Sequence, residues 1–419
     1  MGPFIKLQRT KRNMTQEELA EGIVSLSYLS KIENQKTKAS PQIIQLLCDR
    51  LGIELMDKAD SQIEEKCKEW YDLLFDRYDK QLITANYEEL QQMMDRSINN
   101  HLIMFEIHKI RYYVVLRDFE KASNKINELY GMVDSFNHTQ SYYWYKFKGN
   151  HYSLKEDHQQ AMRCYKTAEE KIRLANIDEA EIANLHYTLS VTHSKLWEEL
   201  EAIDYAKQAM AVFQRNYDFI SCALCHILLG ISYQRIKMLK RAMKNYNLAK
   251  HLGELNSNEE VVQLVDLNIG YLYRITGNSE AAIKNYLIAA KSKKIDYNHR
   301  LAAIINLIQE YFTIREYAKV REYLRQAENI LELAKNKYYN KLYDYSIQVY
   351  KYLLNGDVNK FKSILTDDFL PYLKQQGDYG NLVIYAKLLA AQLEEMGKYK
   401  ESVQYYKLVS NSYNKLINL

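Results

Sequence analysis

The sequence predicts an all-α protein in two parts, a small N-terminal helical domain followed by a long array of helical hairpins. Glycine and proline, the residues that most often break helices, number only 13 and 3 in 419 residues. A spacing of small and aromatic residues recurs about every forty residues along most of the chain. A chain of this length also exceeds what one compact core usually supports, so several units or a repeat array are expected.

Composition alone does not reveal a ligand. Hydrophobic residues make up 47% and charged residues 26%, which is typical of a folded, soluble chain, and the net charge is only +4. The distribution of charge is more informative. The first predicted helix carries Lys6, Arg9, Lys11 and Arg12 and no acidic residue, which suits phosphate groups unless it is simply a solvated face.

Four short helices are predicted before residue 60. The first covers about residues 5–12 and the second residues 16–20, where Thr15 is the N-cap and Glu18 completes a capping box. Gly22 makes a turn, and a third helix covers residues 27–33. The fourth begins at Ser40-Pro41 and ends at Leu51-Gly52, because proline suits the first helical position and glycine the position after the last.

The second and third helices form a recognisable motif. An apolar seam of Leu19, Ala20, Ile23, Leu29 and Ile32 is expected to lock them together at a steep angle. The strings at residues 14–20 and 28–34 resemble the Cro/repressor-type helix-turn-helix family. That resemblance implies that the third helix enters the major groove of double-stranded DNA and that neighbouring polar residues hold phosphates. The predicted DNA-binding residues are Arg9, Arg12, Gln16, Ser27, Tyr28, Ser30, Lys31 and Lys38. A four-helix domain without a DNA role is the alternative.

The remaining sequence repeats one template. Gly230, Tyr233, Ala242, Tyr246 and Ala249 recur forty residues later as Gly270, Tyr273, Ala282, Tyr286 and Ala289. This spacing resembles the tetratricopeptide repeat, in which small residues let two helices approach and aromatics fill the spaces between them. The first small positions fall at 78, 110, 149, 190, 230, 270, 308, 349 and 390, which predicts nine hairpins. We therefore expect a helix-turn-helix domain over residues 1–60 and a repeat domain over residues 61–419.

Stacked hairpins of this kind form a right-handed superhelix whose concave face is lined by the first helix of each pair. Such a face suits an extended peptide, because asparagine can pair with main-chain N–H and C=O groups and a cationic side chain can hold a carboxylate. The predicted peptide-binding residues are Lys146, Asn150, Asn184, Tyr187, Arg235, Asn268, Tyr271, Arg274, Asn306 and Gln309. They could instead be solvated polar residues.

A repressor-type helix-turn-helix joined to a tetratricopeptide array resembles the peptide-pheromone quorum-sensing regulators of Firmicutes, the Rgg/Rap/NprR/PlcR/PrgX group. Nine hairpins are most similar, within this group, to NprR. The resemblance implies a transcriptional regulator in which a short imported signalling peptide changes the homodimer or homotetramer and its binding to promoter DNA. It also implies that Asn268 and Asn306 are groove asparagines. Two alternatives remain: a Rap-like protein that sequesters a sporulation response regulator when peptide-free, and a phage lysis–lysogeny regulator.

Other classes of protein find little support in the sequence. Five scattered cysteines suggest reduced thiols, and Cys222 and Cys225 are expected to be packing residues because no βαβ context surrounds them. No phosphate loop, nucleophile motif or metal-ligand spacing indicates an enzyme, a metal or a cofactor. No membrane span and no signal-peptide core are predicted, so a cytoplasmic location is expected.

Overall fold

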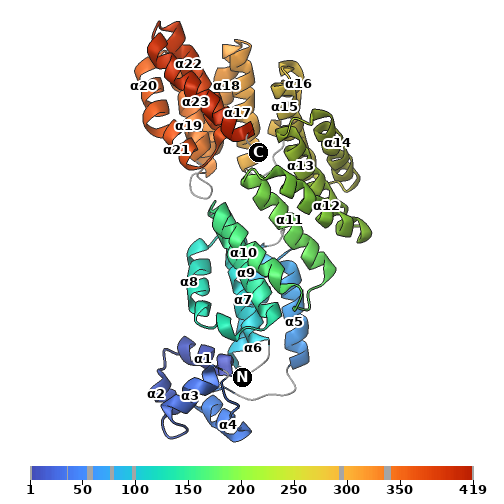
Figure 1. Ribbon diagram of the computed structural model, residues 1–419, viewed down its shortest axis with the longest axis vertical. Helices are drawn as coiled ribbons and strands as arrows, with labels where there is room; N and C mark the ends of the chain where they lie inside the picture. The colour runs from blue at the N-terminus through green and yellow to red at the C-terminus, as the bar shows by residue number, and fades with distance from the viewer. Residues whose placement is uncertain are drawn as a thin grey trace. The chain divides into compact units, whose positions relative to one another are not determined.

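The computed structural model describes residues 2–34, 36–53, 60–75, 80–96, 101–291, 297–334 and 341–417. Over these ranges the chain is helical and contains no strand, so the predicted all-α class is confirmed (Figure 1). The chain divides into two compact units, Met1–Leu185 and His186–Leu419. The predicted border at residues 60 and 61 stays a prediction.

The first unit begins with four short helices, α1 (Gly2–Lys11), α2 (Gln16–Ala20), α3 (Leu26–Glu33) and α4 (Pro41–Arg50). The predicted caps are present. Thr15 and Glu18 form a reciprocal capping box at the start of α2, and Ser40 caps α4, which has proline in its first turn. These side chains satisfy backbone N–H groups that have no partner within the helix. The caps therefore fix where each short helix starts.

The rest of the first unit consists of repeat hairpins, in which α5 pairs with α6, α7 with α8 and α9 with α10. The elements are α5 (Asp60–Leu73), α6 (Lys80–Arg96), α7 (Leu102–Leu116), α8 (Phe119–Tyr130), the short 3₁₀ helix η1 (Val133–Ser135), α9 (His138–Leu154) and α10 (His158–Lys171). Helix α11 (Glu179–Lys195) crosses from the first unit into the second. One apolar cluster includes residues of α1–α4 and of α5–α9, so both kinds of helix share a core in this unit.

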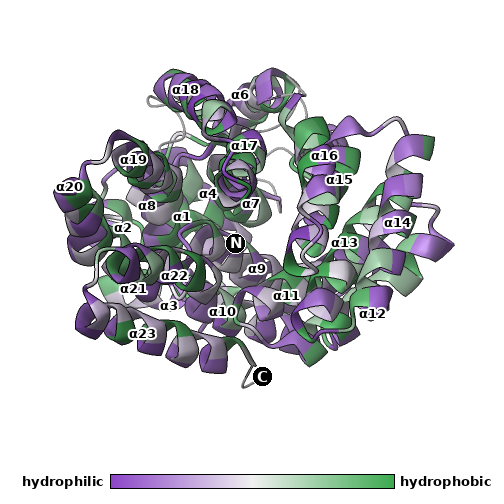
Figure 2. Cartoon of the chain, turned by 90° about the horizontal axis from the view of Figure 1, so that it is seen from above, coloured by the Kyte–Doolittle hydropathy of each residue, from purple (hydrophilic) through white to green (hydrophobic). Residues whose placement is uncertain are grey.

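The second unit continues the array. Its elements are α12 (Glu199–Arg215), α13 (Phe219–Arg235), α14 (Leu239–Leu255), α15 (Glu259–Ile275), α16 (Ser279–Lys291), α17 (Tyr297–Thr313), α18 (Tyr317–Ala334), α19 (Lys341–Asn355), α20 (Val358–Ser363), the π-helix η2 (Ile364–Phe369), α21 (Leu370–Gln375), α22 (Tyr379–Glu395) and α23 (Tyr399–Ile417). Hydrophobic and hydrophilic residues alternate along α14 and α23, as expected of amphipathic helices with one buried face (Figure 2).

The small positions of the repeat template work as predicted in three hairpins. A methyl group on Gly149, Gly230 or Gly270 would lie within 2.6 Å of a tyrosine ring of the second helix. Those rings belong to Tyr165, Tyr246 and Tyr286, each buried and each sixteen residues further along the chain. Only glycine leaves room for an aromatic ring directly against the first helix.

The register predicted for the first hairpin was wrong. Counted from the mark at position 78, the template puts Gln81 on the first helix of that pair and Leu90 and Met94 on the second, but all three lie on α6. The turn lies between α5 and α6, and the mark at position 78 falls outside the described residues. This segment has no close-packed glycine, so apolar spacing alone matched the template, and that spacing is the same on either helix of a hairpin.

Candidate functional site

The predicted recognition helix α3 presents a polar face. Ser25 caps its first turn, and Leu29 and Ile32 are buried against the rest of the small domain. Ser27 and Lys31 are exposed, whereas Tyr28 and Ser30 are half-buried. Because residues four apart share a helix face, Ser27 and Lys31 lie one above the other. This arrangement suits contacts with base edges in a major groove.

The carboxylate of Glu33, at the end of α3, joins the first three helices. Arg9 Nε lies 2.7 Å from Glu33 Oε1, and Gln16 Nε2 donates to Glu33 Oε2 at 2.6 Å. Glu33 is only 1% exposed. Arg9 and Gln16, both predicted to contact DNA, are thus held by an internal carboxylate that orients α1 and α2 against α3.

The other predicted DNA-binding residues lie nearer the surface. Arg12 is exposed at the end of α1, and its guanidinium donates to the side chain and the carbonyl oxygen of Gln8. Lys38 is exposed in the segment between α3 and α4. The sequence analysis missed Arg50, which donates to the carbonyl oxygens of Glu18, Leu19 and Glu21 and so fixes the end of α2.

Three of the predicted peptide-binding residues lie in the first unit. Lys146 Nζ lies 2.5 Å from Glu181 Oε1 and donates to Asn184 Oδ1 at 3.0 Å. Lys146 is 1% exposed, and burial lowers its pKa although Glu181 opposes that shift. Asn150 Oδ1 accepts a hydrogen bond from Tyr165 at 2.8 Å. The structure therefore brings Lys146 and Asn184 into direct contact, beside the acid Glu181 that the sequence analysis did not identify.

In the second unit, Arg235 is also paired internally. Its Nη1 lies 2.6 Å from Glu199 Oε1 and donates to the carbonyl oxygen of Ser194 at 2.5 Å. Its guanidinium carbon lies 4.1 Å from the centre of the Trp197 ring, a cation–π contact. The sequence analysis missed Glu199. Tyr187 lies half-buried on α11, and no role for it follows from the described contacts.

The largest group of predicted peptide-binding residues meets at α15 and α17. Arg274 Nη1 donates to Asn306 Oδ1 at 3.2 Å and to Gln309 Oε1, while its Nε pairs with Glu310 at 3.2 Å. Gln309 in turn donates to the hydroxyl oxygen of Tyr385 at 3.2 Å. A partly buried chain of hydrogen bonds thus holds Arg274 and Asn306 in place.

Asn268 and Tyr271 lie on α15, half-buried. Asn268 and Asn306 are each the tenth residue of a seventeen-residue helix, so they occupy matching places in consecutive hairpins. The amide of Asn268 donates to the carbonyl oxygen of Leu264 in its own helix at 2.7 Å. Burial raises the pKa of Tyr271, which keeps its phenol neutral and able to donate a hydrogen bond.

The missed acids share one feature that the sequence could have revealed. Glu181, Glu199 and Glu310 lie 35 or 36 residues from Lys146, Arg235 and Arg274, which is close to one repeat. An acid and a base about one repeat apart on adjoining hairpins can meet across the interface between them. These three cations are therefore paired with carboxylates of this chain.

In the described part of the chain, the residues considered for other chemistry do not come together as a reactive or metal-binding site. Cys222 and Cys225 are buried and unlinked, and burial raises the pKa of Cys222 to about 11 and that of Cys225 further. Thiols with raised pKa values are poor nucleophiles. Among the described residues no cluster of His, Cys, Asp or Glu is placed to hold a metal ion. No helix in those ranges is long and apolar enough to cross a membrane.

Fold and sites together define a class of protein, a helix-turn-helix domain joined to a tetratricopeptide-like helical array. The Helix-turn-helix family matches residues 5–57. The transcriptional activator NprA of Geobacillus stearothermophilus is 32% identical over 96% of this chain and 100% of its own length. The chain therefore belongs to the family of the transcriptional activator NprA.

Two solved structures show the same fold. A Rap protein complexed with Competence and Sporulation Factor has a TM-score of 0.71 at 17% identity and covers 85% of this chain and 99% of its own. NprR in complex with its cognate peptide NprX has a TM-score of 0.64 at 20% identity and covers 86% of this chain and 99% of its own. At these identities the likeness concerns the architecture of the helices.

Proposed function

We propose that the chain is a cytoplasmic quorum-sensing transcriptional regulator that binds a short signalling peptide on its repeat array and, in response, changes its oligomeric state and its binding to promoter DNA. It acts by binding, without catalysis. The observation that carries the proposal is the family relationship to NprA, a transcriptional activator aligned along its whole length. The polar face of α3 is the part of this chain that suits DNA.

The proposed peptide site rests on two supports. NprR, which shares this fold, is solved with its peptide NprX. In this chain, Arg274, Asn306 and Gln309 form a connected polar group, and Asn268 holds the matching position one hairpin earlier. An asparagine amide can donate to and accept from a peptide main chain at once, so a row of asparagines binds an extended strand whatever its side chains.

The experiment combines DNA and peptide. Fluorescence anisotropy of a labelled promoter fragment from upstream of the chain's own gene gives the affinity for DNA. A library of synthetic heptapeptides supplies the ligand, with a scrambled version of each heptapeptide as its control. We expect specific DNA binding whose Kd changes with one peptide sequence. Identical Kd values with every peptide would overturn the proposed switch.

The Rap-like alternative, sequestration of a response regulator by the peptide-free protein, stays a prediction, because the likeness to the Rap structure concerns the fold alone. A pull-down with a purified sporulation response regulator separates the two functions. Sequestration predicts capture that a peptide abolishes and that persists after residues 1–60 are removed. The proposed transcriptional function predicts that removal of residues 1–60 abolishes DNA binding.

A further inference from the structure

Three of the four cations in and directly after α1 are held within the protein. Lys6 Nζ donates to the carbonyl oxygen of Gly131 at 3.0 Å, and Lys11 Nζ lies 2.5 Å from Glu106 Oε1. Gly131 follows α8 and Glu106 lies on α7, so both contacts join the small N-terminal domain to one repeat hairpin. Arg9 is paired with Glu33 within the small domain. Arg12, which directly follows α1, is the one of the four that is exposed, and its described side-chain hydrogen bonds go to Gln8 of α1.

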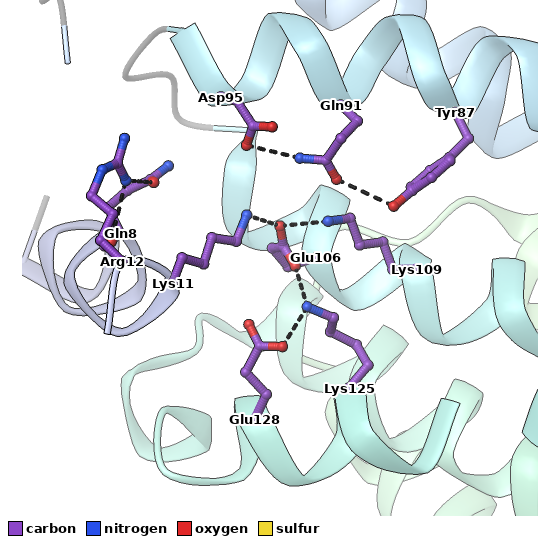
Figure 3. A network of polar contacts seen from close by, with 10 residues as sticks. All are labelled: Gln8, Lys11, Arg12, Tyr87, Gln91, Asp95, Glu106, Lys109, Lys125 and Glu128. Carbon is purple, nitrogen blue, oxygen red and sulfur yellow. Dashed lines mark hydrogen bonds and ion pairs between the residues drawn. The ribbon is translucent and has the colours of Figure 1, made fainter. Parts of the chain in front are cut away.

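Glu106 is the centre of the contact with the repeat hairpin. Its carboxylate is fully buried and meets ammonium groups from three helices: Lys11 of α1, Lys109 of α7 at 2.9 Å and Lys125 of α8 at 2.7 Å (Figure 3). Lys125 also pairs with Glu128 at 2.6 Å. Burial by itself raises the pKa of Glu106, but the three ammonium groups lower it well below its usual range. The carboxylate is therefore charged.

The three lysines are not equivalent. Lys109 and Lys125 approach opposite oxygens of Glu106 and have side chains 5% and 10% exposed, whereas that of Lys11 is 20% exposed in the last turn of α1. If Lys11 leaves, each oxygen of Glu106 still has an ammonium partner and no buried charge is left unpaired. The large cost of breaking a buried ion pair comes from such an unpaired charge. The contact with Lys11 can therefore open while the hairpin stays intact.

We propose that the Lys11–Glu106 ion pair is a latch that docks the DNA-binding domain on the α7–α8 hairpin and withholds Lys11 from DNA phosphates until it opens. This inference rests on the proposed function, since it concerns how that domain meets DNA. Lys11 is the last residue of α1, and the exposed cation Arg12 follows it directly. Opening the latch would place a second cation beside Arg12 and add one phosphate contact.

The adjacent charges Lys11 and Arg12, at the end of α1 and directly after it, provide a matched pair of variants. Lys11→Met keeps most of the apolar stem and removes the ammonium group, and Arg12→Met removes the neighbouring charge without touching the array. Two measurements on the full chain separate their roles. Hydrogen exchange of α1 amides reports whether the helix is docked. The dependence of DNA affinity on salt reports phosphate contacts, because each contact adds about 0.9 to the slope of log K against log salt concentration.

The latch predicts opposite results for the two variants. Lys11→Met should make the α1 amides exchange several-fold faster and leave the salt slope unchanged. Arg12→Met should leave exchange unchanged and lower the slope by about 0.9. A slope lowered by Lys11→Met as much as by Arg12→Met, with unaltered exchange, would show that Lys11 already contacts DNA and would overturn the latch.

A gain of function completes the test. Glu106→Gln weakens the acceptor of Lys11, so the freed Lys11 should raise the affinity for DNA. The slope of log K against log salt concentration should become steeper by about 0.9, and the added substitution Lys11→Met should cancel that gain. If Glu106→Gln does not fold, the comparison of Lys11→Met with Arg12→Met decides alone. If the wild-type chain binds no promoter DNA, the proposed function fails. The latch is still tested by hydrogen exchange of the α1 amides in Lys11→Met: unchanged exchange overturns it, and faster exchange supports it.

Discussion

The backbone at Gly270 lies directly against the ring of Tyr286. A methyl group on Gly270 would stand 2.6 Å from Cε1 of that ring, and Tyr286 is fully buried on the second helix of the hairpin. A buried ring cannot move aside without disturbing the residues around it. The same relationship joins Gly149 to Tyr165 and Gly230 to Tyr246, so these hairpins depend on direct contact between backbone and aromatic ring.

Gly270→Ala should therefore destabilise the protein. Overpacking a filled core costs about 1–3 kcal/mol, which outweighs the gain that alanine normally brings to a helix. Urea unfolding followed by circular dichroism measures the change. Gly380→Ala is the matched control, because the added methyl group there would meet only Asp378 at 3.7 Å, and it should be neutral or stabilising. Equal stability of the two variants would contradict the proposed packing.

Asn306→Ala tests the proposed peptide site. The substitution removes an amide that meets Arg274 Nη1 at 3.2 Å, and it should weaken binding of the active heptapeptide about tenfold, the effect of one lost hydrogen bond of about 1.4 kcal/mol. Isothermal titration calorimetry measures the affinity, and the helical circular-dichroism signal should be unchanged. Asn285→Ala, on the second helix of a hairpin, is the control and should bind normally. Normal affinity in Asn306→Ala would refute the placement.

Glu33→Ala tests the anchor of the recognition helix. The change leaves the guanidinium of Arg9 and the amide of Gln16 without their carboxylate. Removing one partner of a largely buried ion pair costs about 3 kcal/mol. We expect α1–α3 to open more often, which native-state hydrogen exchange measures as a lower local free energy of opening. Glu21→Ala, at an exposed helix end, should leave exchange of these helices unchanged.

We expect the protein to lose stability in acid because of the buried imidazole of His108. His108 is 2% exposed, and the centre of its ring lies 3.6 Å from the centre of the Tyr71 ring. Its Nδ1–H donates to the carbonyl oxygen of Met104 at 2.8 Å. Burial lowers its pKa from 6.5 to about 3. The folded protein therefore binds a proton at His108 less readily than the unfolded chain does. The contribution of neutral His108 to the free energy of unfolding is complete above pH 6.5 and is lost as the pH falls towards 3.

The expected effect is about 1.4 kcal/mol per pH unit within that window. His108→Phe keeps the aromatic stack and removes the titrating group, so its free energy of unfolding should fall less steeply with decreasing pH than that of the wild-type protein. Urea titrations at several pH values give both curves. Parallel curves would show that His108 takes up its proton at its ordinary pKa.

The sequence predicted the class of fold and most hairpins because both depend on local patterns. Scarce glycine and proline indicate helix, and the spacing from Gly270 to Tyr286 identifies a close-packed pair directly. The first hairpin was placed wrongly because α5 and α6 carry only apolar spacing, which does not distinguish the first helix from the second.

The sites were harder to predict because the role of a cation depends on its partner. Lys146 and Arg235 have the residue type expected of a peptide ligand, but Glu181 and Glu199, on other helices, pair with them. Lys11 belongs to a basic patch in the sequence, and its partner Glu106 lies 95 residues away. Pairings at such distances follow from how the hairpins stack.

The contact between Arg235 and Trp197 gives the second unit an optical reporter. The chain has three tryptophans, and Trp70 and Trp144 lie in the first unit. Indole emission responds to a cation held over the ring, here 4.1 Å from its centre. A ligand that draws Arg235 away from Glu199 and Ser194 would change the fluorescence of Trp197, so occupancy of this part of the array could be followed in real time without an attached dye.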